Sequence, residues 1–142
     1  MIKNVFLTLV LTLGTLFGVS AFAQGQQEIP LASTKRFATT YSNDLYAKKE
    51  DKGVTIFGVV TTLTSNTLTF TLQGKRPDGV YYDLLTSAAS AATGTHTIKA
   101  YPGMTASANV SISEPLPPVF RIKATHTNSG TATYTVQMNR HR

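Results

Sequence analysis

The stretch Thr67-Leu-Thr-Phe-Thr-Leu-Gln-Gly74 alternates strictly between threonine and apolar side chains before it ends in Gln-Gly. Leu68, Phe70 and Leu72 fall on one face, and the three threonines fall on the other. A period of two with one apolar face is typical of an antiparallel strand that packs on one side against a core. The stretch therefore predicts a β-strand with an inward apolar face and an outward threonine face.

Two more segments, Val119-Phe-Arg-Ile-Lys-Ala-Thr125 and Thr131-Ala-Thr-Tyr-Thr-Val-Gln-Met138, repeat this alternation. His126 continues the inward parity of the first segment, so we expect a half-buried structural histidine there. Residues 54–63 are apolar on both faces and predict a central buried strand. Weaker strand candidates are residues 36–41, 81–85, 96–101 and 106–112.

Turn-forming residues separate these segments. Lys75-Arg-Pro-Asp-Gly79 combines a proline of fixed φ with a glycine that tolerates positive φ, which predicts a hairpin between residues 67–74 and 80–85. Asn128-Ser-Gly130 predicts a similar turn before the last strand. Prolines interrupt the predicted strands in Tyr101-Pro-Gly103 and Glu114-Pro-Leu-Pro-Pro118. Because proline has no N–H to donate, a sheet is not expected to continue through these segments.

These patterns predict an all-β fold. Twenty threonines follow residue 23, and this β-branched residue favours strands over helices. About seven or eight short strands then predict a single antiparallel β-sandwich, immunoglobulin-like or jelly-roll-like, over residues 36–139. We expect residues 24–35 to form a flexible N-terminal arm and residues 140–142 a basic tail.

The N-terminus has the pattern of an export signal. One lysine precedes a charge-free apolar run over residues 5–19, and Ser20-Ala-Phe-Ala23 offers small residues at a cleavage site. Residues 1–23 therefore predict a signal peptide cut after Ala23, and a protein exported to the periplasm, the cell surface or the medium. The alternative is an uncleaved membrane anchor, but the run of about 15 residues is shorter than the roughly 20 that span a bilayer.

The composition narrows the function. The 142-residue chain has no cysteine, which excludes disulfides, zinc–thiolate sites and thiol nucleophiles. His96, His126 and His141 lack the spaced partners of a metal site, and no nucleophile elbow or glycine-rich phosphate loop occurs. We therefore predict no catalytic, metal or cofactor-binding residues, no small-molecule substrate and a non-enzymatic protein.

The net charge of +6 permits an acidic partner but does not identify one. The basic residues are not interleaved with aromatic residues, so nucleic-acid binding is not expected. The flat threonine faces offer little binding energy, because their hydroxyls exchange water contacts for equivalent ones. The candidate binding residues are the basic groups of the predicted turns and tail: Lys75, Arg76, Arg140 and Arg142.

Several segments resemble known proteins. Gln73-Gly-Lys-Arg-Pro-Asp-Gly-Val-Tyr-Tyr-Asp-Leu-Leu-Thr-Ser-Ala-Ala89 is similar to a QGKDP-x-SGKYY-x-LL-x-SAA pattern in small structural proteins of tailed bacteriophages. Residues 92–109 resemble their ATGT…YPGLTA-x-AN segment, and residues 116–127 their LP-x-x-W/F-R-V-x-V-x-H strand, with Phe120 as the aromatic residue. The resemblance covers residues 54–138 and implies a β-sandwich component of the virion or head–tail region, with no catalytic residues to carry over.

The predicted function is therefore that of a structural or assembly protein of a phage or prophage virion. It would contact other virion or surface proteins and form a homo-oligomer or array. The signal peptide departs from the phage pattern and favours the alternative, an exported bacterial surface or periplasmic binding module. A secreted hydrolase inhibitor or carbohydrate binder is a third hypothesis, although the sequence lacks tryptophan and clustered tyrosines that stack on sugars.

Overall fold

A computed structural model describes residues 26–31, 39–64, 67–127 and 130–142. The strands of this part of the chain are β1 (Gln26–Ile29), β2 (Thr39–Tyr41), β3 (Leu45–Tyr46), β4 (Gly53–Thr64), β5 (Leu68–Lys75), β6 (Tyr81–Thr86), β7 (Gly94–Ala100), β8 (Ser111–Ile112), β9 (Val119–His126) and β10 (Thr131–His141). In the same residues, no helix has the length and apolar character needed to cross a membrane. The predicted signal peptide lies outside the described residues.

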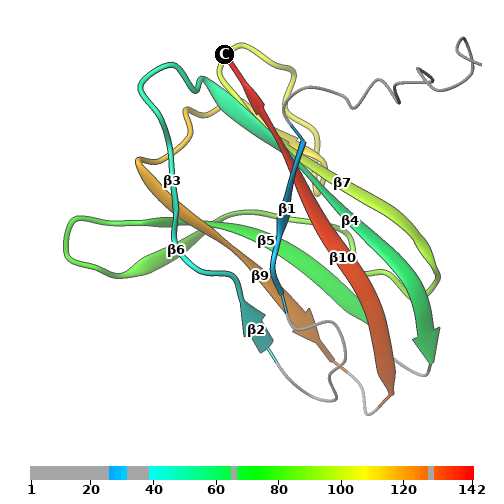
Figure 1. The fold of residues 1–142 in the computed structure, drawn as a ribbon. Helices are drawn as coiled ribbons and strands as arrows, with labels where there is room; N and C mark the ends of the chain where they lie inside the picture. Colours follow the sequence, from blue (N-terminus) through cyan, green and yellow to red (C-terminus); the bar gives the residue numbers. More distant parts are fainter. Residues whose placement is uncertain (1–25, 32–38, 65–66, 128–129) are drawn as a thin grey trace, which may run out of the picture.

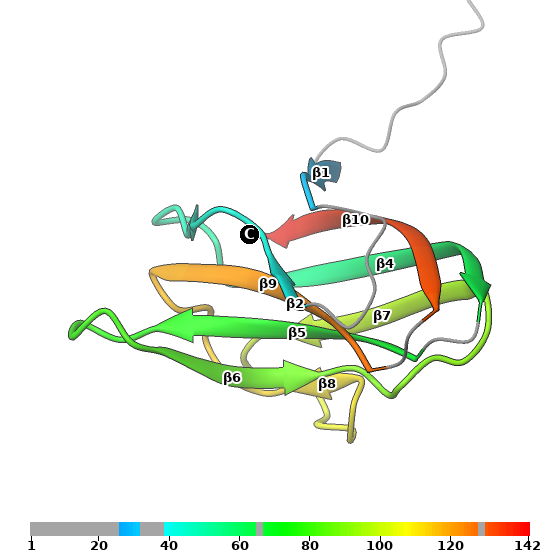
Figure 2. The same cartoon turned by 90° about the horizontal axis from the view of Figure 1, so that it is seen from below.

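The strands form two sheets that face each other across one core (Figures 1 and 2). The first sheet has the order β1-β10-β4-β7-β8, and the second has the order β2-β9-β5-β6, with β3 also paired to β9. All pairs are antiparallel except the short parallel pair of β7 with β8. The all-β prediction is confirmed, but the expectation of purely antiparallel pairing is wrong at β8, and the described strands outnumber the predicted ones.

The alternating segments pack as their period predicts. Along β9 every second residue is buried, and β10 follows the same rule up to Met138. The buried apolar residues form one cluster with members from both sheets: Ile29, Val54, Ile56, Val60, Leu68, Phe70, Leu72, Leu85, Ile98, Ala100, Phe120, Ile122, Ala124, Ala132, Tyr134, Val136 and Met138. The predicted inward position of His126 is confirmed, but the side chain is buried and not half-buried as expected.

A close backbone approach sets the spacing at the centre of the core. A Cβ atom on Gly58 of β4 would lie 2.3 Å from the ring of Phe70 on β5. The same ring meets Tyr134 of β10 edge-on, with 5.4 Å between the ring centroids. The hydroxyl of Tyr134 is 3.0 Å from the hydroxyl of Thr40 on β2. Glycine at position 58 thus lets an aromatic ring of one sheet lie directly on the backbone of the other.

The outward face of β5 differs from the prediction. Thr71 is buried, not exposed, and its hydroxyl lies 3.0 Å from the hydroxyl of Thr86 on β6. Gln73 on the same face is buried as well. The alternation assigned the correct face, but Gln73 is hydrogen-bonded there to Arg121 and Asp83 of other strands, and a single strand's sequence does not record its neighbours.

Both predicted termini of the domain are more ordered than expected. Residues 26–29 of the predicted flexible arm form β1, which pairs with β10 and buries Ile29. The predicted basic tail is also wrong, because β10 continues through Arg140 and His141. His141 pairs with Gly53 of β4, its Nε2 lies 2.7 Å from the hydroxyl of Thr55, and its ring stacks on Tyr101.

The predicted hairpin is confirmed. β5 and β6 pair antiparallel, the amide of Arg76 donates to the carbonyl of Val80, and Gly79 has φ +86°. Gly103, in the Tyr101-Pro-Gly103 interruption, also has positive φ. The predicted strand over residues 106–112 is reduced to β8, and residues 128–129 of the second predicted hairpin turn lie outside the described residues.

The core assignment can be tested at Phe120, whose side chain is completely buried. We expect Phe120→Ala to lower the free energy of unfolding by about 3–5 kcal/mol, because it removes a buried aromatic ring and leaves a cavity. Thr135→Ala is the matched control on an outward face and should cost less than about 1 kcal/mol. Urea denaturation measures both, and equal losses would contradict the assigned core.

Burial also makes stability depend on pH. It lowers the pKa of His126 below its ordinary value of 6.5, so the native state binds this proton less readily than the unfolded chain. The free energy of unfolding should therefore fall as the pH drops from 6.5 toward 5. His126→Gln should remove this decline, as measured by denaturation at several pH values. If the free energy of unfolding fell equally in the variant, the decline would come from the protonation of other groups.

Candidate binding surface

The predicted basic residues Lys75 and Arg76 lie where the β5–β6 hairpin begins to turn. In Figures 1 and 2 this hairpin extends past the ends of the other strands. Both residues line a cleft of about 410 Å³ between the hairpin and the proline-rich segment 114–118. Tyr82, Leu84 and Leu116 contribute apolar side chains to the cleft, and Glu114 contributes an acid.

A glycine at position 74 lets the walls of the cleft lie close to the backbone of β5. A Cβ atom on Gly74 would come within 2.8 Å of Pro117 and of the Tyr82 ring, so only glycine lets these two side chains meet over the backbone of β5. The Arg76 guanidinium carbon lies 5.8 Å from the centre of the Tyr82 ring. Arg76 is exposed and remains accessible at the rim. The cleft thus has an apolar lining and a basic edge.

Lys75 is engaged within the protein. Its Nζ lies 2.9 Å from Asp44 Oδ2, and the Tyr81 hydroxyl donates to the other oxygen of the same carboxylate. Hydrogen bonds from Lys75 and then Tyr81 hold the pKa of Asp44 below its ordinary value, outweighing the smaller opposite effect of burial. The same contact with Asp44 holds the pKa of Lys75 above its ordinary value. Lys75 therefore serves as a structural cation more than as an available one.

Arg140 is an internal ion-pair partner. It forms an ion pair with Asp51, whose side chain is 0% exposed, and its Nη1 donates to the carbonyl of Tyr46 at 2.9 Å. Burial would raise the pKa of Asp51, but the hydrogen bonds from the Lys48 amide and from Arg140 outweigh burial and lower it. Arg140 thus ties the end of β10 to the turn before β4.

The four predicted binding residues do not form one patch. Arg142 is exposed at the C-terminus, and both views place that terminus away from the hairpin tip (Figures 1 and 2). With Lys75 and Arg140 in ion pairs, the accessible members of the predicted set are Arg76 and Arg142. The sequence could not show which of the four basic residues form ion pairs, because Asp44 and Asp51 are distant in the chain from Lys75 and Arg140.

A larger polar surface lies on the outward face of the second sheet. We call it the outer-face network, and it comprises Tyr41, Asp44, Gln73, Lys75, Tyr81, Asp83, Arg121 and Lys123. Lys123 donates to both oxygens of Asp83 at 3.0 and 2.9 Å, and Gln73 Nε2 donates to Asp83 Oδ1 at 2.5 Å. Burial would raise the pKa of Asp83, but the hydrogen bonds from Gln73 and Lys123 outweigh it, so the pKa is lowered.

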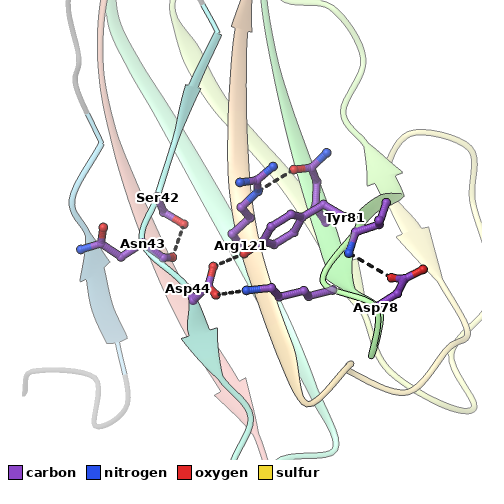
Figure 3. A network of polar contacts seen from close by, with 9 residues as sticks. Ser42, Asn43, Asp44, Asp78, Tyr81 and Arg121 are labelled. Atoms are coloured by element: carbon purple, nitrogen blue, oxygen red, sulfur yellow. Dashed lines mark hydrogen bonds and ion pairs between the residues drawn. The ribbon is translucent and has the colours of Figure 1, made fainter.

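Arg121 occupies the middle of this network (Figure 3). Its guanidinium carbon lies 3.4 Å from the centre of the Tyr81 ring and 4.0 Å from that of Tyr41. Its Nε donates to Gln73 Oε1 at 2.8 Å. Two aromatic faces and one hydrogen bond therefore fix the plane of this cation.

A break in the edge strand places Asp44 in the network. β2 and β3 both pair with β9, and between them Ser42 exchanges two hydrogen bonds with the backbone of Ile122. The chain then bulges outward through Asn43 and brings the Asp44 carboxylate over the sheet (Figure 3). Tyr81 reaches it from β6, so the contact spans the sheet.

The sequence did not identify Arg121, Tyr41 or Tyr81 as site residues. Tyr41 and Tyr81 are forty residues apart in the chain, so their positions in the sequence do not suggest a cluster. The signal in the sequence that could have indicated Arg121 was its outward position, since it alternates with the inward Phe120 and Ile122. The register of the four strands β2, β9, β5 and β6 then brings these side chains together.

Among the described residues, no group of three or more histidine, aspartate or glutamate side chains could hold a metal ion. No model of a known protein family matches the chain, and no curated protein matches it significantly.

The ion pair of Arg140 gives a stability prediction. Arg140→Gln would leave the buried Asp51 carboxylate without its cation, so we expect the free energy of unfolding to fall by about 1–3 kcal/mol. Arg142→Gln removes the same charge two residues later, at an exposed site, and should change it by less than about 0.5 kcal/mol. Chemical denaturation of both variants tests this difference, and equal effects would show that net charge alone matters.

Proposed function

We propose that this protein is a non-enzymatic structural or assembly module of the kind found in phage or prophage virions, with its two sheets forming an immunoglobulin-like or jelly-roll-like β-sandwich. The observation that carries the proposal is the β5–β6 hairpin. It projects from the sheets and is built from the segment that resembles small phage structural proteins, residues 73–89.

The two faces of this hairpin support a binding role. Gln73 and Lys75 on β5, with Tyr81 and Asp83 on β6, point into the outer-face network. The intervening Tyr82 points to the opposite side and lines the cleft. One short segment therefore supplies both a rigid polar surface and an apolar recess, which are the two parts of a typical protein–protein interface.

The proposed partners are other virion or surface proteins, or further copies of this chain in an oligomer or array. Exposed basic groups such as Arg76 would attract an acidic surface and raise the rate of association. Such attraction decays over about 8–10 Å at physiological salt, so it acts only once the two surfaces are close to contact.

A second candidate function is an exported bacterial surface or periplasmic binding module. The sequence feature that favours it is the charge-free run that ends at Ala21-Phe-Ala23. In this case the same hairpin would contact a cell-surface partner, and the protein would leave the cytoplasm by itself.

The location of the natural protein separates these functions. Particles purified from an induced culture of the source bacterium should contain the protein as a fixed component, detected by mass spectrometry of the particle and periplasmic fractions. Enrichment in the periplasm alone, with no particle-bound protein, would exclude the virion function and favour the surface module. Where the leader is processed as predicted, the mature N-terminus is Gln24, and an intact Met1 would contradict export.

Attachment through the basic rim should weaken as salt is added. Arg76→Gln should weaken attachment to the natural particle or surface severalfold at low salt and reduce its salt dependence, because it removes an accessible charge. Lys99→Gln is the matched control, since Lys99 is exposed on the other sheet. Co-sedimentation over a salt series measures this. Equal effects of the two variants would place the contact elsewhere.

A further inference from the structure

Arg121 is the cation of the outer-face network that has no ion-pair partner among the described residues. Lys75 is paired with Asp44, and Lys123 with Asp83. Arg121 uses only its Nε for a hydrogen bond within this part of the chain, so Nη1 and Nη2 have no acceptor there. Figure 3 shows the guanidinium beside the Tyr81 ring.

We propose that Arg121, clamped between Tyr41 and Tyr81, is a receptor for a single carboxylate on the acidic surface of a partner protein. The proposal deepens the proposed function, since it rests on a protein partner and names the group that partner presents. A guanidinium donates two parallel N–H bonds to a carboxylate. Here the ring stacking and the Gln73 contact hold its plane before the partner arrives, which lowers the entropic cost of binding.

The charge of the surface favours a carboxylate over a phosphate. Three cations and two carboxylates of the network leave one unmatched positive charge, enough for one monoanion. Asp44 and Asp83 both interact electrostatically with Arg121, and their negative charges would oppose a phosphate dianion more strongly.

The rim of the site suits a protein partner. Tyr41 is 49% exposed, and Tyr46 on β3 is 66% exposed. Tyrosine and arginine are enriched at the centres of protein interfaces. The tyrosine ring buries a large area at low entropic cost. An acidic side chain held by Arg121 would thus be surrounded by aromatic contact area.

The test is an NMR titration of the purified protein, expressed from the full-length gene and labelled with ¹⁵N. The probes are three blocked glycine pentapeptides that carry a central glutamate, glutamine or phosphoserine. We expect a saturable shift of the Arg121 Nε–H signal with the glutamate peptide. Its affinity should exceed that of the glutamine peptide by about fivefold, the upper range for an exposed ion pair.

Three variants separate the clamp from general charge. Arg121→Lys keeps the charge but loses the planar fork, and it should bind the glutamate peptide as weakly as the parent binds the glutamine peptide. Tyr41→Ala removes one stacking face and should weaken binding without changing the net charge. Lys99→Gln removes a charge outside the network, at an exposed position on the other sheet, and should change the affinity less than twofold.

Several results would overturn the proposal: parent-like binding by folded Arg121→Lys protein, an equal loss in Lys99→Gln, or tighter binding of the phosphoserine peptide. If Arg121→Lys fails to fold, Tyr41→Ala decides, and its parent-like affinity would also overturn the proposal. The titration needs no particle. A failed clamp therefore leaves the virion function to be judged by particle composition, and absence from particles leaves the carboxylate site to be judged by the titration.

Discussion

The contact between the ring of Phe70 and the backbone at Gly58 joins the two sheets at their centre, and the rest of the structure depends on it. A side chain at position 58 would overlap that ring, with a Cβ atom only 2.3 Å away. The ring then meets Tyr134 edge-on, an arrangement that aromatic quadrupoles favour. Because the two sheets approach this closely, the alternating apolar residues of β5, β9 and β10 fill a single core without a helix or disulfide in the described residues.

Polar contacts outside the core hold the remaining elements in place. The ion pair of Arg140 with Asp51 joins the end of β10 to the turn before β4. The Asp44 carboxylate joins the connection between β2 and β3 to Lys75 and Tyr81 of the hairpin. Each of these contacts links segments that are distant in the chain. They also bear on the proposed binding role, because every cation that forms such a pair is less available to a partner. Lys75 and Lys123 are both paired in this way, which leaves Arg121 as the network cation on which the proposed carboxylate site rests.

The β5–β6 hairpin contributes to the core and also carries the surfaces of the proposed binding role. Its alternation sends Gln73 and Lys75 outward, while Gly74 between them lets Pro117 and Tyr82 pack over the backbone. In the middle of β5 the period of two directs apolar side chains into the core. Beyond the core the same period gives the hairpin a polar face and a face that lines the cleft. We consider this the physical basis of the proposed assembly role, since a projecting hairpin exposes both of its faces to a partner.

The sequence by itself determined the all-β class, the inward residues of β5, β9 and β10, and the turn at Gly79. These features depend on local steric preferences and on a period of two, which a single strand carries in its own residues. Only the tertiary structure decided that Thr71 is buried, that β10 extends through the predicted tail, that Arg140 is paired, and that Arg121 lies between two tyrosines. Each of these depends on which strands are neighbours and in what register, and this is fixed by packing between segments that are far apart in the chain.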